Sequence, residues 1–142
     1  MTPPTRPPTA DELLADPVVR QEMEAAWVDS LADDPANRHE EGGWVYQDTA
    51  TGRIAVRRAP PGTMRRLDLG NPPPVSGSVI VGTYHTHPNP TAEGWEPGPS
   101  RTDEVNAARS GVPWLIRADD GYHKTGPDCR RGGTTGGPGF PP

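Results

Sequence analysis

Two histidines one residue apart, at the end of an apolar run, constrain this chain more than any other feature. The run Val79-Ile80-Val81-Gly82 leads into His85-Thr86-His87-Pro88. β-Branched and small apolar residues in such a run favour a buried strand. Side chains alternate along a strand, so His85 and His87 project from the same face. Both imidazoles can therefore reach a single ion without a bend in the backbone.

A carboxylate further along the chain completes a set of three metal ligands. Asp103, in Ser100-Arg101-Thr102-Asp103, would add an oxygen to the two imidazole nitrogens. Zinc takes this mixture of ligands, and three protein ligands leave the fourth tetrahedral position open, as in catalytic sites. Unligated histidines on an apolar strand would be costly unless exposed. The sequence therefore predicts one zinc ion per chain, held by His85, His87 and Asp103.

The segment from Ser100 to Asp103 also has a purely structural interpretation. Serine followed three residues later by an acid is a helix-capping pattern that satisfies free amides at a helix start. A ligand at the start of a helix can serve both purposes, so both interpretations remain open at this point.

Glycine and proline are concentrated at the two ends of the chain. The 142 residues include 17 glycines and 20 prolines, a share that reaches the range where disorder is expected. Residues 1–9 are rich in proline and threonine, and residues 129–142 are mostly glycine, proline, threonine and arginine. We expect a disordered N-terminal tail (1–9), one domain (10–128) and a flexible C-terminal tail (129–142).

Charge and composition exclude several classes of partner. The net charge is −5 and the acidic residues are dispersed, so we expect no nucleic-acid partner. The basic pairs at 57–58 and 65–66 are interpreted as solvated. A single cysteine, Cys129, excludes an internal disulfide and a cysteine-based zinc site. No apolar run approaches the ~20 residues of a membrane span and no secretory signal opens the chain. We expect a cytoplasmic protein without a membrane partner, and the oligomeric state stays open.

Periodicity and turn signals predict a small α/β domain. Residues 10–31 have helical spacing, with Pro17 dividing the segment near Asp16. Residues 100–110 form a second predicted helix that Gly111 ends, and residues 89–99 are expected to be irregular. Strands are expected at 43–47, 53–59, 64–69, 78–87, 113–117 and 122–125. This order predicts a small mixed sheet with helices packed on it.

Three motifs in this order resemble the JAMM family, the metalloprotease branch of the MPN/JAB domains. The family has a glutamate with a glycine three residues on, then His-x-His-Pro, then Ser-x-x-Asp. This chain has Glu40-Glu41-Gly42-Gly43, followed by the histidine motif at 85–88 and the serine motif at 100–103. The resemblance covers about residues 40–125.

The resemblance implies a fold and a set of roles. The fold would be a curved mixed β-sheet flanked by helices, an α+β arrangement related to cytidine deaminases. His85, His87 and Asp103 would bind zinc, Glu40 would act as general base and then acid, and Ser100 would stabilise the oxyanion. The expected function is zinc-dependent hydrolysis of a peptide or isopeptide bond in a protein or peptide substrate. Ubiquitin-like proteins with a terminal Gly-Gly are candidate substrates.

Several alternatives accompany this hypothesis. Glu41 competes with Glu40 for the role of base, and a non-catalytic MPN-type scaffold is the alternative function, although such scaffolds typically lose ligands. A zinc deaminase would need Pro-Cys-x-x-Cys, which one cysteine excludes. The eleven residues between Pro88 and Ser100 are more than the resemblance leads us to expect. They include Trp95, which we predict contacts substrate. Trp27, Trp44 and Trp114 are expected in the core, and His39 and His123 on the surface.

Overall fold

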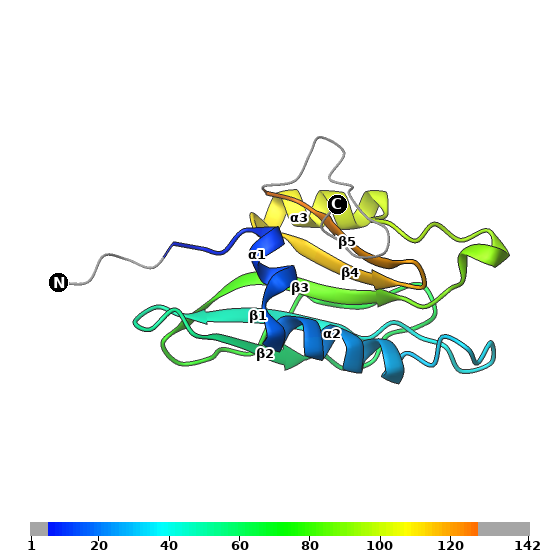
Figure 1. Ribbon diagram of the computed structural model, residues 1–142, viewed down its shortest axis with the longest axis horizontal. Helices are drawn as coiled ribbons and strands as arrows, with labels where there is room; N and C mark the ends of the chain where they lie inside the picture. The colour runs from blue at the N-terminus through cyan, green and yellow to red at the C-terminus, as the bar shows by residue number, and fades with distance from the viewer. Residues whose placement is uncertain (1–5, 128–142) are drawn as a thin grey trace.

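A five-stranded mixed sheet forms the centre of the computed structural model, which describes residues 6–127 (Figure 1). The spatial order is β2-β1-β3-β4-β5, with β3 and β4 parallel and every other neighbouring pair antiparallel. The strands are β1 (Gly42–Asp48), β2 (Ile54–Arg58), β3 (Ser78–His87), β4 (Trp114–Ala118) and β5 (Gly121–Thr125). The mixed α+β sheet predicted from the sequence is confirmed. The predicted C-terminal tail, 129–142, and residues 1–5 lie outside the described residues.

Two consecutive helices, α1 (Ala10–Ala15) and α2 (Pro17–Asp29), pack on one face of the sheet (Figure 1). The predicted break at Pro17 is confirmed, and Asp16 explains it. The Asp16 carboxylate accepts hydrogen bonds from the amides of Val18 and Val19 and so caps α2. Proline at the first helical position fits, because its missing N–H would have no helical partner there. In the described range no helix is long and apolar enough to cross a membrane.

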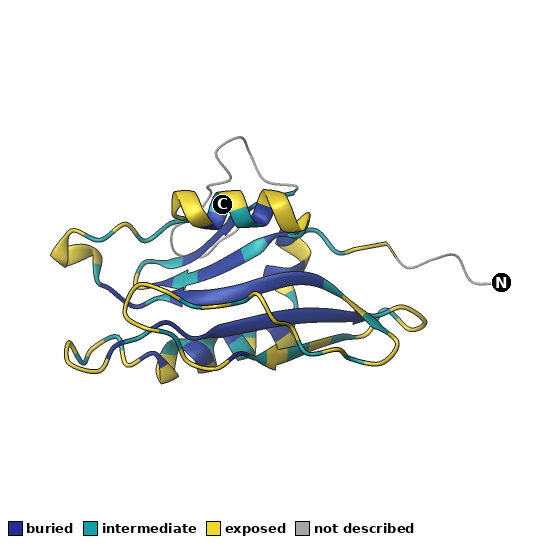
Figure 2. Ribbon diagram, turned by 180° about the vertical axis from the view of Figure 1, so that it is seen from behind, coloured by how far each residue is buried: buried dark blue, intermediate teal, exposed yellow. Residues whose placement is uncertain are grey.

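Strand β1 and the second half of β3 are almost entirely buried (Figure 2). Apolar side chains form two separate clusters, one on each side of these strands. Toward the helices, the cluster includes Leu13, Leu14, Met23, Val45, Tyr84 and Leu115. On the opposite face, the connection between β2 and β3 crosses Trp44 and Tyr46. The Trp44 indole N–H donates to the Leu69 carbonyl at 3.1 Å, and the Tyr46 hydroxyl donates to the Pro73 carbonyl at 2.6 Å. The strand predicted at 64–69 is wrong: the segment is irregular, and side-chain donors use its carbonyls instead of a neighbouring strand.

A β-bulge at Val81 determines which face of β3 carries the histidines. Val45 pairs with Gly82 and Tyr46 pairs with Ile80, so Val81 is left without a partner on β1. The extra residue shifts the alternation by one position. Ile80 therefore packs beside Trp44 and Tyr46, while Val81 and Tyr84 join the cluster under the helices. His85 and His87 consequently face away from α2.

Helix α3 (Arg101–Ser110) packs against β4 and β5 and follows a short 3-10 turn, η1 (Thr91–Glu93). Gly111 ends α3 with φ of 74°, a left-handed conformation that glycine adopts without strain. The predicted helix at 100–110 and the predicted strands at 113–117 and 122–125 are confirmed within one residue at each end.

Some side chains differ from the predicted burial. His123 was expected on the surface, which is wrong: it is buried on β5, and its Nε2 lies 2.7 Å from an Asp120 carboxylate oxygen. Trp44 is buried as expected, whereas Trp27 and Trp114 are only partly buried. The Arg117 guanidinium stacks on the outer face of Trp27. The cation over Trp27 comes from β4, far along the chain, so local sequence does not identify it.

Gly42 lies where β1 and β3 leave no room for a side chain, and this generates the first prediction. A Cβ atom at Gly42 would lie 2.2 Å from the Tyr84 carbonyl oxygen and 2.8 Å from His85 Cα. Both are backbone atoms, so relief requires the strands to separate. We expect Gly42→Ala to lower the free energy of unfolding by about 1–3 kcal/mol, measured by urea titration.

Gly70→Ala is the matched control for this prediction. A Cβ there would meet only the Asp68 carboxylate, at 3.0 Å, and that flexible side chain can move. We expect a change within about 0.5 kcal/mol. Equal stability of the two variants would show that β1 and β3 are not this close.

Candidate active site

Three side chains of the types that can bind a metal ion converge from β3 and α3. His85 and His87 project from the end of β3, and Asp103 projects from the first turn of α3. The two Nε2 atoms are 3.1 Å apart, His85 Nε2 lies 3.3 Å from Asp103 Oδ1, and His87 Nε2 lies 3.2 Å from Asp103 Oδ2. His85 and Asp103 are buried and His87 is partly buried. The three residues predicted as ligands are thus brought together.

The spacing and the donor types fit a tetrahedrally coordinated metal ion. Ligand atoms about 2.0–2.1 Å from such an ion lie roughly 3.3 Å from one another, close to the separations observed. His87 Nδ1 lies 3.2 Å from the Pro97 carbonyl oxygen. A carbonyl only accepts, so Nδ1 carries a proton, and Nε2, the nitrogen that faces His85 and Asp103, is the atom left to bind a metal ion. The group can therefore hold a metal ion.

Ser100 and Asp103 also form a complete capping box, as the structural interpretation of the motif predicted. The Asp103 amide donates to Ser100 Oγ at 3.0 Å, and the Ser100 amide donates to Asp103 Oδ2 at 2.9 Å. These bonds hold the carboxylate at the helix start while its oxygens face the imidazoles. The two interpretations of this motif are therefore compatible, because one carboxylate satisfies the cap and faces the histidines.

The charges of the three ligands are mutually dependent. Burial would raise the pKa of Asp103, but the two neighbouring imidazoles hold that pKa well below its usual range. Burial alone would lower the pKa of His85. The neighbouring Asp103 carboxylate has the opposite and larger effect, so the pKa of His85 is raised. Asp103 is thus ionised across the physiological range, which is the state that a metal ligand needs.

The two neighbouring glutamates occupy opposite faces of the sheet. Glu40 lines the same cleft as the three ligands, and burial raises the pKa of its carboxyl, an effect that His85 and His87 partly oppose. Glu41 faces away from the cleft. Its carboxylate lies 2.6 Å from His39 Nε2 and 3.1 Å from Arg58 NH1. Of these two glutamates, Glu40 is therefore the one that lines the cleft.

A cleft of about 880 Å³ opens over these residues. One wall is the irregular segment 65–69 and the other is formed by the loop between β3 and α3, which includes Trp95. The Arg65 guanidinium lies 4.8 Å from the centre of the Trp95 ring and so connects the two walls. Ser100 lines the cleft between the ligands and the loop wall. The cleft has the volume of a typical ligand site.

Residues 20–131 match the family model described as prokaryotic homologs of the JAB domain. The chain belongs to this family. The match runs from α2 to beyond β5 and includes Glu40, the three ligands and the cleft. Comparisons of this JAB domain with curated proteins and with solved structures found no match.

Sequence reasoning missed parts of the JAB-domain cleft. Trp114 lines it and lies edge-on to His85, with ring centroids 6.0 Å apart. It does so because β4 runs parallel to β3 and pairs Trp114 with Thr83, a register with no local sequence signal. Arg65 was interpreted as solvated but covers Trp95. Arg58 was interpreted likewise, which is wrong: it pairs with Glu22, Asp29 and Glu41.

Proposed function

We propose that this JAB-domain protein is a zinc-dependent peptidase or isopeptidase. One observation carries the proposal: the three convergent donor atoms and the buried Glu40 carboxylate open into the same cleft. A non-catalytic scaffold would need neither an uncommitted carboxylate nor a ligand set with an open side. The family membership supports the same conclusion, because the ligands and Glu40 match the JAMM motif residue by residue.

The residues that would hold zinc are His85, His87 and Asp103. When bound, zinc would supply Lewis-acid polarisation of the scissile carbonyl and lower the pKa of a coordinated water. Two imidazoles and one carboxylate are a typical donor set for such catalytic sites. The pairwise separations of 3.1–3.3 Å need little change for ligation.

Glu40 would transfer the proton. Its carboxylate accepts a proton from the attacking water as the new carbon–oxygen bond forms, and then donates it to the leaving nitrogen as the carbon–nitrogen bond breaks. Burial is the chief cause of the raised pKa of Glu40. A raised pKa suits both steps, because a group that accepts and then donates a proton works best when its pKa is nearer the operating pH. The net reaction adds one water across the bond and returns Glu40 to its ionised state.

Ser100 would stabilise the developing oxyanion. Its Oγ accepts the Asp103 amide, and no described residue accepts the hydroxyl hydrogen. That hydrogen is free to donate to a substrate oxygen whose negative charge grows in the transition state. Trp95 would contact the substrate chain along the loop wall. A ubiquitin-like protein ending in Gly-Gly is the first substrate to test.

Zinc binding is the second prediction. Wild-type protein should bind about one zinc per chain, and zinc at 100 times the dissociation constant should stabilise it by about 2.7 kcal/mol. Asp103→Asn keeps an oxygen for the Ser100 amide but loses the ligand charge. We expect it to bind zinc at least 10–100-fold more weakly, measured by calorimetry. Asp68→Asn, a cleft residue outside the donor set, is the control, and equal losses in both variants would contradict this ligand assignment.

Removal of the base is the third prediction. Glu40→Gln should lower the rate of hydrolysis by about 10²–10⁴-fold while zinc content stays at the wild-type level, because Glu40 is not a ligand. The assay uses ubiquitin-like proteins joined through Gly-Gly to a reporter by a peptide bond or to lysine by an isopeptide bond. An active Glu40→Gln would exclude Glu40 as the base.

The role of Trp95 is the fourth prediction. Trp95→Ala should lower kcat/KM without a comparable fall in Tm, because the ring is partly exposed at the cleft. Trp27→Ala is a matched control, since Trp27 is also partly buried beneath an arginine but does not line the cleft. If Trp95→Ala loses stability and retains turnover, Trp95 has a structural role only.

A further inference from the structure

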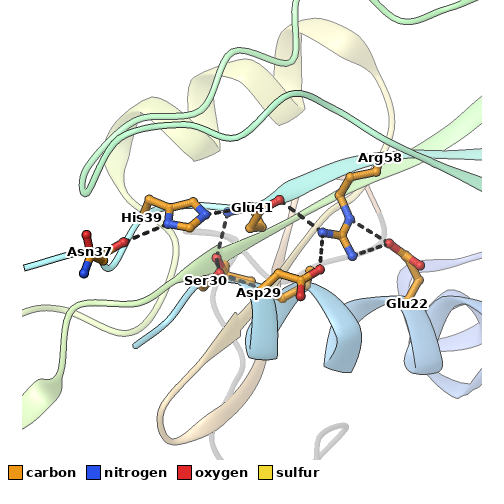
Figure 3. A network of polar contacts seen from close by, with 9 residues as sticks. Glu22, Asp29, Ser30, Asn37, His39, Glu41 and Arg58 are labelled. Carbon is orange, nitrogen blue, oxygen red and sulfur yellow. Dashed lines mark hydrogen bonds and ion pairs between the residues drawn. The ribbon is translucent and has the colours of Figure 1, made fainter. Parts of the chain in front are cut away.

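A polar network surrounds Glu41, whose side chain does not line the cleft that Glu40 enters (Figure 3). It joins the middle and the end of α2 to the residues that precede β1 and to Arg58 of β2. The residues labelled in Figure 3 are Glu22, Asp29, Ser30, Asn37, His39, Glu41 and Arg58. Thr86, between the two histidine ligands on β3, connects to this network through Ser30 and Glu41.

The hydrogen bonds through Thr86 have a defined direction. The Glu41 amide donates to Thr86 Oγ1 at 3.0 Å, and Ser30 Oγ donates to the Ala26 carbonyl at 2.8 Å. Thr86 Oγ1 and Ser30 Oγ are 2.5 Å apart. Because the Ser30 hydrogen is already used, Thr86 donates to Ser30 and accepts from Glu41. This buried chain links α2, the ligand-bearing strand and the backbone of Glu41.

The Glu41 carboxylate is held by two cations. Arg58 lies 3.1 Å from one oxygen and also pairs with Glu22 at 2.7 Å and Asp29 at 3.0 Å. His39 lies 2.6 Å from the other oxygen, and its Nδ1 lies 2.9 Å from the Asn37 carbonyl. Both partners of His39 are acceptors, so both ring nitrogens donate, which only the imidazolium can do.

Glu40 has no comparable support of its own. No described residue donates a hydrogen bond to its carboxylate. Only its backbone is held, through the Thr63 carbonyl and the Gly62 amide at 2.8 and 2.9 Å. Successive side chains in an extended segment point to opposite sides. Restraint of Glu41 on the far side therefore sets the direction in which Glu40 enters the cleft.

We propose that Thr86 and Glu41 are positioning residues that hold the Glu40 carboxylate opposite the metal ligands. Thr86 acts on both halves of the site, because it lies between His85 and His87 and also accepts the Glu41 amide. Glu41 acts through its ion pair with Arg58. The inference rests on the proposed role of Glu40 as the base.

The test compares Thr86→Val, which removes the hydroxyl with little change of shape, with Thr86→Ser, which retains it. In zinc-free protein, ¹³C NMR follows the titration of the Glu40 side-chain carboxyl, assigned with Glu40→Gln. Thr86→Val should move that titration toward the pKa of an ordinary glutamate, because the carboxyl is no longer held in the buried position. Thr86→Ser should titrate like the wild type. If the Glu40 carboxyl of Thr86→Val titrates as in the wild type, the inference is overturned.

The second readout is the rate of hydrolysis of the Gly-Gly reporter substrate that the wild-type protein cleaves. Thr86→Val and Glu41→Gln should lower kcat by about 10- to 100-fold, with KM and zinc content unchanged. Neither should cause further loss in the Glu40→Gln background, because both act through Glu40. Glu24→Gln, which breaks a different ion pair between α2 and the sheet, is the control and should retain full activity. If Thr86→Val and Glu41→Gln lower kcat by the same factor in the Glu40→Gln background as in the wild type, the inference is overturned.

The two readouts separate this inference from the proposed function. If wild-type protein cleaves no substrate but the NMR titration shifts in Thr86→Val, the proposed function fails and the positioning stands. If wild-type protein is active and the titration does not shift, the positioning fails and the proposed function stands.

Discussion

Strands β1 and β3 approach each other at Gly42 and His85 so closely that no side chain fits between them, and the site depends on this contact. A Cβ at Gly42 would overlap the Tyr84 carbonyl and the His85 backbone. The pairing brings the residues just before β1 next to the end of β3, where the histidines project. Glu40 and the two imidazoles then line one cleft although they are distant in sequence.

The two sides of this strand pair differ in how their glutamate carboxylates are paired. On the cleft side, burial raises the pKa of Glu40, and no described donor satisfies its carboxylate. On the helix side, Arg58 and His39 neutralise Glu41, and Thr86 holds its amide. A buried carboxylate is costly unless it is paired. The cleft therefore contains the carboxylate that is available for chemistry, whereas the opposite face contains the one that stabilises the structure.

Much of this arrangement could be predicted from the sequence, because its signals are local. The strand containing His85 and His87, the helix that begins after Ser100 and the break at Pro17 all follow from patterns within a few residues. The family resemblance added Glu40, whose carboxylate alone would look like a solvated charge. The motif register favoured Glu40, which has Gly43 three residues on. Glu41 stayed an alternative because its partner Arg58 lies on another strand.

Other features depend on contacts between distant segments. The bulge at Val81 shifts the alternation of β3 and cannot be read from a continuous apolar run. Trp114 reaches the cleft through the parallel pairing of β4 with β3. The segment 64–69 lies between two Pro/Gly-rich loops and was expected as a short strand, but its carbonyls accept hydrogen bonds from Trp44 and Asn89. In each case the decisive partner lies far along the chain, where local propensity carries no information.

The central claim is that His85, His87 and Asp103 bind one ion while Glu40 stands beside it as a free base. Anomalous diffraction at the zinc absorption edge, from crystals of zinc-loaded protein, tests this most directly. The account predicts one peak bounded by the two Nε2 atoms and the Asp103 carboxylate, with the Glu40 carboxylate in the same cleft but outside ligand distance. A peak elsewhere, or one coordinated by Glu40, would contradict it.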